Sequence, residues 1–95
     1  MRLTQKEIIA IKESFTKVFQ KGEIYLFGSR LDDKARGGDI DLFIRGCEKE
    51  KIKEKKIKFL VELKKQIGDQ KIDVVIAKDD GNPIEQEALQ KGIKL

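Results

Sequence analysis

Two aspartates separated by one residue, Asp39 and Asp41, open an apolar segment in the first half of this 95-residue chain. In a β-strand, side chains at positions i and i+2 point to the same face, so the two carboxylates would lie side by side. Like charges at such close range repel each other and do not stabilise a fold. A divalent cation between them removes the repulsion, and Mg²⁺ prefers such hard oxygen ligands. The spacing therefore predicts a Mg²⁺ site at the start of this strand.

A Gly-Ser pair ends the preceding apolar segment and could bind phosphate. Gly28 would allow a ligand to approach the backbone closely, and the backbone N–H groups and the Ser29 hydroxyl can donate hydrogen bonds. Arg30 could hold a phosphate with two hydrogen bonds, although an arginine that enters a turn is equally typical of a protein surface. Lys34 and Arg36 in the following turn are weaker candidates for phosphate binding. The turn thus predicts contacts with the phosphates of a nucleotide.

The short connection between the two apolar segments fixes their relative direction. Only nine residues, 30–38, separate Ser29 from Asp39. Because parallel strands need a longer crossover, the two strands should be antiparallel neighbours. The phosphate-binding turn and the carboxylates would then lie at the same end of the sheet. That arrangement suits a nucleoside triphosphate with its metal ion.

A third aspartate is expected to join the first two. Residues 71–77 are rich in β-branched side chains, which is typical of a strand, and they follow a predicted helix over about residues 49–67. A strand–helix–strand unit makes a right-handed crossover to a parallel neighbour, so Asp73 should arrive beside Asp39 and Asp41. Three carboxylates at one point could hold two metal ions, and Asp73 could help to take a proton from an attacking hydroxyl. In the structural alternative, Asp39 caps a turn and the other two are exposed strand residues.

The remaining segments are expected to form helices that cover the sheet. Thr4 to Glu7 has the sequence of a capping box, and we expect a helix from there to Gly22, with a last helix over about residues 84–91 that Pro83 opens. The tail 93–95 should follow without regular structure. The predicted apolar faces are Ile8, Ile11, Phe15, Val18 and Phe19 in the first helix, and Ile52, Ile57, Phe59, Leu60, Leu63 and Ile67 in the second.

The order of elements, α-β-turn-β-α-β-α, predicts an α/β (α+β) fold. We expect one domain over residues 1–95, with a small mixed β-sheet and helices packed mainly on one face. Many lysines surround the apolar stripe of the second helix. They form either a solvated face or a basic surface for an acidic partner or RNA.

Composition excludes several kinds of site. The chain has no histidine, which excludes Ser-His-Asp and Cys-His catalysis and argues against a zinc site. Cys47 is the one cysteine, so an intrachain disulfide is impossible, and no histidine can activate its thiol. Tyr25 lies inside a predicted strand and is expected to pack in the core. Since the chain lacks a long apolar run and the apolar core of a signal peptide, we expect a cytoplasmic protein with no membrane partner.

The pattern Gly28-Ser29, a spacer and Asp39-x-Asp41 resembles the nucleotidyltransferase superfamily of the DNA polymerase beta type. The short length resembles its minimal nucleotidyltransferase (MNT) branch, and the likeness covers nearly the whole chain. The spacer is slightly shorter than is common in that family, a difference that its glycines could absorb. The resemblance implies that Asp39, Asp41 and Asp73 are catalytic metal ligands and that Gly28, Ser29 and Arg30 bind the nucleotide. It also implies two Mg²⁺ ions, with ATP or another nucleoside triphosphate as substrate.

The resemblance further implies transfer of a nucleoside monophosphate, expected to be AMP from ATP, to a hydroxyl group. MNT proteins are often antitoxins of HEPN-domain proteins. The implied acceptor is therefore a tyrosine of a helical HEPN-type toxin, whose adenylylation would silence it. Composition and spacing alone indicate neither ATP, nor tyrosine, nor such a partner. A chain of 95 residues also leaves little room for an acceptor-binding domain of its own, so we expect the acceptor site to come from another chain.

Two other classes of function stay open at this point. In the first, the chain is a non-catalytic binding module that neutralises or scaffolds a partner, although such a module has no physical reason to keep three clustered carboxylates. In the second, the chain binds nucleic acid, which its net charge of +4 would allow. Nucleic-acid binding predicts exposed aromatic residues for stacking. The five phenylalanines and one tyrosine lie mostly in apolar periodic stretches, so this alternative is not favoured.

Overall fold

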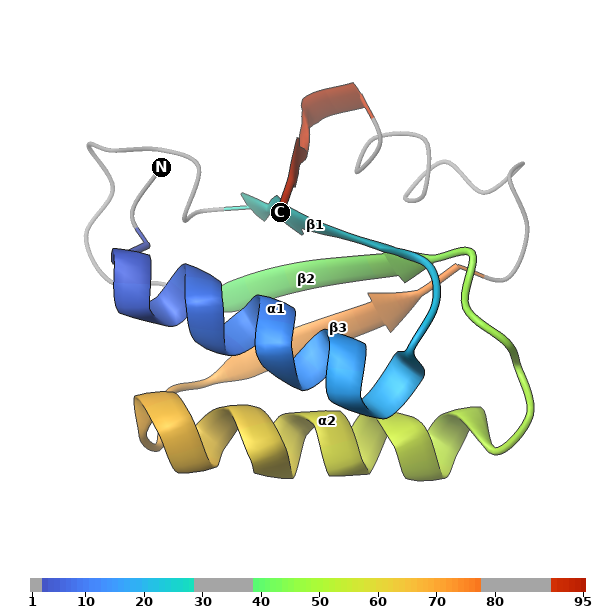
Figure 1. Ribbon diagram of the computed structural model, residues 1–95. Coiled ribbons are helices and arrows are strands. Elements are labelled where there is room, and N and C mark those ends of the chain that lie inside the picture. The colour runs from blue at the N-terminus through green and yellow to red at the C-terminus, as the bar shows by residue number, and fades with distance from the viewer. Residues whose placement is uncertain (1–2, 29–38, 78–89) are drawn as a thin grey trace.

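The structure is a computed structural model that describes residues 3–28, 39–77 and 90–95. Figure 1 shows helices and strands in the order α1, β1, β2, α2, β3 and β4. Their bounds are α1 Gln5–Phe19, β1 Glu23–Phe27, β2 Ile40–Arg45, α2 Ile52–Ile67, β3 Ile72–Ile76 and β4 Ile93–Lys94. No helix in the described ranges is long and apolar enough to cross a membrane.

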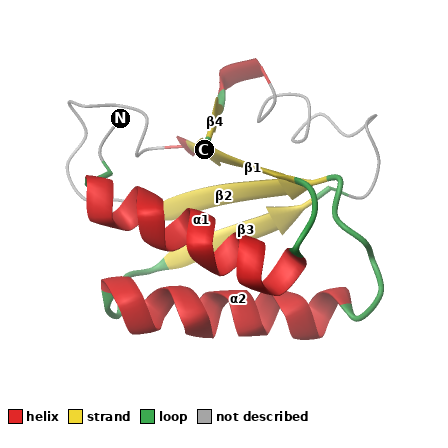
Figure 2. Ribbon diagram, in the orientation of Figure 1, coloured by secondary structure: helices red, strands yellow, loops and turns green. Residues whose placement is uncertain are grey.

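The strands form a mixed sheet in the order β3-β2-β1-β4. β1 and β2 are antiparallel, as their short connection predicts, and β2 and β3 are parallel, as the helix between them predicts. Both long helices lie on the same face of the sheet (Figure 2). The expected small mixed sheet with helices mainly on one face is therefore confirmed.

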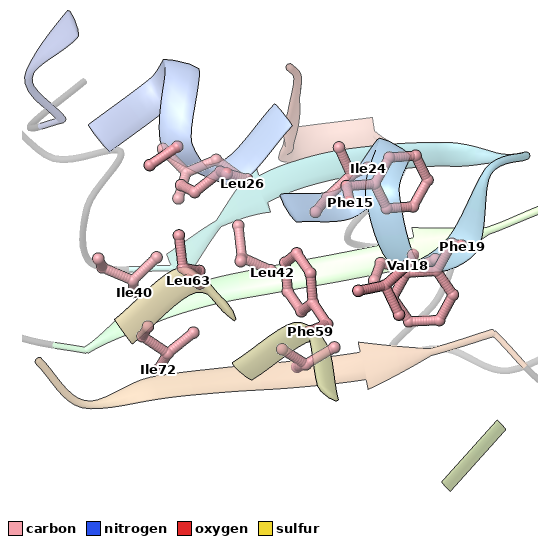
Figure 3. Close-up of a cluster of buried hydrophobic side chains, with 14 of the residues drawn as sticks. Phe15, Val18, Phe19, Ile24, Leu26, Ile40, Leu42, Phe59, Leu63 and Ile72 are labelled. Atoms are coloured by element: carbon pink, nitrogen blue, oxygen red, sulfur yellow. The ribbon is translucent and has the colours of Figure 1, made fainter. Parts of the chain in front are cut away.

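The main hydrophobic core lies between this face of the sheet and the two helices (Figure 3). Alternate strand residues point into it, and they meet apolar side chains of both helices. The ring of Phe19 on α1 packs edge-on against Phe59 on α2, with the ring centroids 5.7 Å apart. The most deeply buried members are Ile11, Leu26, Ile40, Leu42, Ile44, Phe59 and Leu63. Because strand side chains alternate, the residues between them point to the opposite face.

A second, smaller apolar cluster lies on that opposite face. Phe43 and Ala77 are buried there, and Tyr25, Phe27 and Val75 pack against them. The Tyr25 ring packs in this cluster, with its centroid 6.2 Å from that of Phe43, so Tyr25 is a packing residue as expected. It does not belong to the main core between sheet and helices.

The first helix begins where its sequence predicts. The Glu7 N–H donates to Thr4 Oγ1 at 3.1 Å, and the Thr4 N–H donates to Glu7 Oε1 at 2.9 Å, which completes the capping box. The helix ends at Phe19, before the predicted Gly22, because Gln20 adopts a left-handed conformation with φ 64°. The second helix begins at Ile52, a little after the predicted start near residue 49.

The position predicted for Ile57 in the buried stripe of α2 is wrong. Ile57 is 63 % exposed. Since each helical residue turns by about 100°, Ile57 lies about 200° around the helix from the buried Phe59. An apolar residue at this angle faces away from the sheet, whatever its hydropathy.

The prediction for the C-terminal tail is also corrected. Ile93 and Lys94 form β4, paired antiparallel with β1 through Leu26 and Tyr25. The Leu95 N–H donates to the Ile24 carbonyl at 2.9 Å and continues the pairing. Of the last predicted helix, only residues 90 and 91 lie in the described ranges, and both are helical. Pro83 and residues 84–89 lie outside them.

Candidate active site

The parallel pairing of β2 and β3 makes Asp41 and Asp73 direct neighbours. Side chains at paired positions of adjacent strands point to the same face, here the face opposite α1 and α2. Asp39 lies two residues before Asp41 and at the same end of the sheet. The three aspartates therefore meet at one corner, although their catalytic and metal-binding roles stay predictions. Asp41 is half-buried, and Asp73 is exposed.

The surroundings of Asp41 disfavour its negative charge. Burial contributes most to raising the pKa of its carboxyl group, and the charges of Asp73 and Asp39 raise that pKa further. This is the like-charge repulsion that the Asp-x-Asp spacing implies. A bound cation would relieve it.

Asp39 forms an ion pair with a lysine of the same chain. Its Oδ2 atom lies 3.5 Å from the Nζ atom of Lys71, whose side chain is 77 % exposed. Lys71 directly precedes β3 and stands two residues before Asp73. Lys71 was not among the predicted site residues, although its place two residues before Asp73 is a signal in the sequence.

The side chains are not arranged as a ready-made metal centre. Within the described residues, no three His, Cys, Asp or Glu side chains are grouped so that they could hold a metal ion. The chemistry of the donors nevertheless suits Mg²⁺, since all three are carboxylates and two of them, Asp39 and Asp41, are half-buried. Asp39 would have to exchange Lys71 for the ion.

Gly28 follows β1 and lies directly against Asp41. Its φ is +80°, and a β-carbon added there would lie 2.2 Å from Asp41 Oδ2. Any side chain at this position would thus push the carboxylate aside. From the sequence, we expect this glycine to allow a phosphate to approach the backbone closely. The structure shows that it also allows the Asp41 carboxylate to lie close by. The other predicted nucleotide ligands, Ser29 and Arg30, lie outside the described residues, as do Lys34 and Arg36.

The family model described as polymerase beta, nucleotidyltransferase matches residues 7–95. The chain belongs to this nucleotidyltransferase family. The matched residues include Gly28, the strands β1 to β4 and all three aspartates. Comparison with curated proteins and with solved structures finds no match. Family membership confirms the resemblance to the superfamily and supports a nucleotidyltransferase type of function.

A surface hollow of about 530 Å³ adjoins the aspartates of this nucleotidyltransferase. Its lining includes Phe27, Asp41 and Asp73 from the sheet, and Lys56 and Leu60 from α2. Small-molecule sites commonly have volumes of roughly 300 to 1,000 Å³, so the hollow has the size of a ligand site. Phe27 and Lys56 are further residues that the sequence analysis did not single out, because nothing in their local pattern sets them apart.

Proposed function

We propose that this nucleotidyltransferase transfers a nucleoside monophosphate, AMP from ATP, to a protein hydroxyl and releases pyrophosphate. The observation that supports the proposal best is the pairing of Asp41 with Asp73 on adjacent strands, next to a glycine that leaves room beside Asp41. Family membership supports the class of reaction.

Each residue has a role in this proposal. Asp39, Asp41 and Asp73 would hold Mg²⁺, which would neutralise the charge of the triphosphate and of the departing pyrophosphate. Gly28 would let the triphosphate approach the backbone at the end of β1. Asp73 is exposed and would receive the proton of the acceptor hydroxyl. Ser29 and Arg30 would hold the phosphates.

The acceptor in this proposal is a tyrosine of a helical HEPN-type toxin, and the chain would act as the antitoxin. The resemblance of the sequence to MNT proteins supports this finer assignment. A second protein would present this acceptor, and its main contribution would be proximity and orientation.

A labelling experiment tests the transfer. The chain and a HEPN-type protein are mixed with Mg²⁺ and ATP labelled at the α-phosphate. We expect the label on a tyrosine of the partner, and we expect Asp73→Asn to abolish labelling. Asp69→Asn is the matched control, since Asp69 is an exposed aspartate in the turn before β3. In calorimetry, ATP affinity should fall when EDTA is added; equal affinity would contradict a metal-bridged site.

One observation favours the alternative of a non-catalytic binding module. Asp39 is paired with Lys71, and no three-ligand group is assembled in the described part of the chain. A complex that forms tightly, neutralises the partner and leaves it unlabelled with every nucleoside triphosphate would support this alternative.

A further inference from the structure

β3 forms one edge of the sheet, since in the described part of the chain it pairs only with β2. The Ala77 N–H donates to the Ile44 carbonyl at 2.9 Å, so the odd-numbered residues of this segment turn their peptide groups toward β2. Because alternate residues of a strand turn these groups to opposite edges, Ile72, Val74 and Ile76 direct theirs away from β2. Such an edge can accept an added strand.

Two adjoining hollows follow this edge and lead to the aspartates. One of about 400 Å³ lies along residues 74–77, and the other, of about 530 Å³, continues to Asp41 and Asp73. They share Lys56, Val74 and Val75 in their linings. We call the two hollows together the β3 groove.

Lysines line the α2 side of the β3 groove: Lys49, Lys53 and Lys56. Lys49 Nζ donates a hydrogen bond to the Ala77 carbonyl. Within the described residues, neither Lys53 nor Lys56 forms an ion pair with a carboxylate. Lysines beside an edge discourage pairing with a second copy, which would bring the same charges together. They favour an acidic segment instead.

We propose that the β3 groove binds an extended acidic segment of the acceptor protein, which adds to β3 as a further strand. The inference rests on the proposed function for the fate of the acceptor hydroxyl. Phe27, Asp41 and Asp73 form one row across the sheet. The next position of that row, on an added strand, lies one strand spacing of about 4.8 Å beyond the Asp73 backbone and points to the same face. A serine, threonine or tyrosine there brings its hydroxyl beside Asp73.

The two faces of the sheet set the sequence of this segment. Asp73 points away from α2, whereas the lysines of the groove come from the α2 side. The acidic residues must therefore stand an odd number of residues before or after the acceptor residue, so that their side chains point to the opposite face. Acidic residues on the hydroxyl face would be repelled by the three aspartates.

The acceptor hydroxyl of the bound segment is the nucleophile of the transfer. The acceptor hydroxyl oxygen forms a bond to the α-phosphorus of the nucleoside triphosphate, and the bond from that phosphorus to the bridging oxygen of pyrophosphate breaks. The hydroxyl proton passes to Asp73, and pyrophosphate leaves with the bond electrons. The segment then carries the nucleoside monophosphate as a phosphodiester.

Binding and transfer are measured separately with fluorescent peptides of about eight residues, within the usual strand length of roughly three to ten. The first peptide has tyrosine and valines on one face and glutamates on the other. The second moves the tyrosine by one residue, which turns it to the other face. The third replaces every glutamate by lysine. By fluorescence anisotropy the first two should bind to the full chain and the third should not. With labelled ATP, only the first should be labelled.

Two matched comparisons identify the groove as the binding site. Lys53→Glu with Lys56→Glu should weaken binding of the first peptide at least about tenfold, whereas Lys58→Glu with Lys64→Glu, with equal charge change on exposed positions of the same helix, should change it less than about twofold. Two further versions of the first peptide carry N-methyl groups on alternate backbone amides, one on the odd-numbered and one on the even-numbered residues. Only one of the two should lose binding, because only one set of amides faces β3.

The outcomes separate this inference from the proposed function. Equal binding of the acidic and basic peptides, equal binding of both N-methylated peptides, or stronger binding of single-stranded RNA through the same lysines would overturn the groove assignment. Labelling of the whole partner but not of the bound first peptide would overturn the acceptor position. Groove-dependent peptide binding with no labelling of any acceptor would contradict the proposed function and still support the groove.

Discussion

Gly28 stands so close to Asp41 that a β-carbon on it would lie 2.2 Å from Asp41 Oδ2. The end of β1 and the start of β2 can therefore lie this close together because residue 28 has no side chain. The glycine lets the half-buried carboxylate keep its place next to Asp73. A ligand that binds there meets backbone and carboxylate oxygen at the same point.

Gly28→Ala should displace the Asp41 carboxylate and weaken divalent-metal binding by about tenfold or more. It should also lower the free energy of unfolding by about 1–2 kcal/mol, since φ at this position is +80°. Gly68→Ala is the matched control: its φ is +87°, but an added β-carbon there meets no atom within 4 Å. Mn²⁺ titration followed by electron paramagnetic resonance should separate the two variants. Unchanged Mn²⁺ affinity in Gly28→Ala would refute a metal site at Asp41.

Asp41→Asn should lower the rate of transfer at least about a hundredfold and should not lower stability at pH 7. Burial, Asp73 and Asp39 raise the pKa of Asp41 above its ordinary value of 3.8. The native state thus binds this proton more tightly than the unfolded state does. Ionisation of Asp41 therefore costs stability, and the cost appears as the pH rises from 3.8 through the raised pKa.

Thermal melts without metal test this sign. Asp41→Asn should melt at an equal or higher temperature than the wild-type chain at pH 7, and the difference should shrink below pH 3.8. Asp69→Asn supplies the control for loss of one negative charge. A sharp drop of the melting temperature in Asp41→Asn alone would mark Asp41 as structural.

Lys71→Gln should bind divalent metal roughly two- to fivefold more tightly at low salt. Lys71 lies 3.5 Å from Asp39 and competes with an ion for the same carboxylate, although exposed pairs of this kind are worth at most about 1 kcal/mol. The gain should disappear in concentrated salt, which screens the lysine. Lys94→Gln is the control, because Lys94 pairs with Glu23 at 4.0 Å, a residue outside the aspartate cluster. A tenfold loss of metal affinity in Lys71→Gln would instead make Lys71 a supporting residue of the site.

That Asp39, Asp41 and Asp73 lie at the same end of the sheet could be predicted, because the connections between neighbouring strands determine it. A connection too short for a crossover makes β1 and β2 antiparallel, and a helical crossover makes β2 and β3 parallel. The register that pairs Asp41 with Asp73 then follows from where each strand begins. The roles of Ser29 and Arg30 stay predictions, since both lie outside the described residues.

Other features depend on neighbours that no local pattern reveals. The ion pair of Asp39 is formed by Lys71, one exposed lysine among many. β4 has only two residues, Ile93 and Lys94, and forms by pairing with the free edge of β1. Two residues are too few for an alternating pattern that would indicate a strand. Ile57 is apolar and belongs to a helix, but its angle around that helix turns it to solvent.

Tyr25→Phe should make the chain less stable at neutral pH and less sensitive to acid. The Tyr25 hydroxyl donates to Glu23 Oε2 at 2.6 Å, and this hydrogen bond is the main reason that the pKa of Glu23 lies below its ordinary 4.5. A lowered carboxyl pKa stabilises the native state above 4.5, and that stabilisation is lost as the pH falls through the lowered value. The stability difference between Tyr25→Phe and wild type, from urea denaturation, should therefore shrink below pH 4.5. A constant difference down to pH 2 would contradict it.

Leu63→Ala and Ile57→Ala test which face of α2 is buried. Leu63 is fully buried against the sheet, so its truncation should cost about 2–5 kcal/mol, a large part of the roughly 5–15 kcal/mol that stabilises a domain. Ile57 is 63 % exposed, and its truncation should change the free energy of unfolding by no more than about 0.5 kcal/mol. Urea denaturation at two protein concentrations measures both. If Ile57→Ala costs as much as Leu63→Ala, and the cost grows with concentration, Ile57 is covered by a second chain in solution; if the cost is equal at both concentrations, the orientation of α2 is wrong.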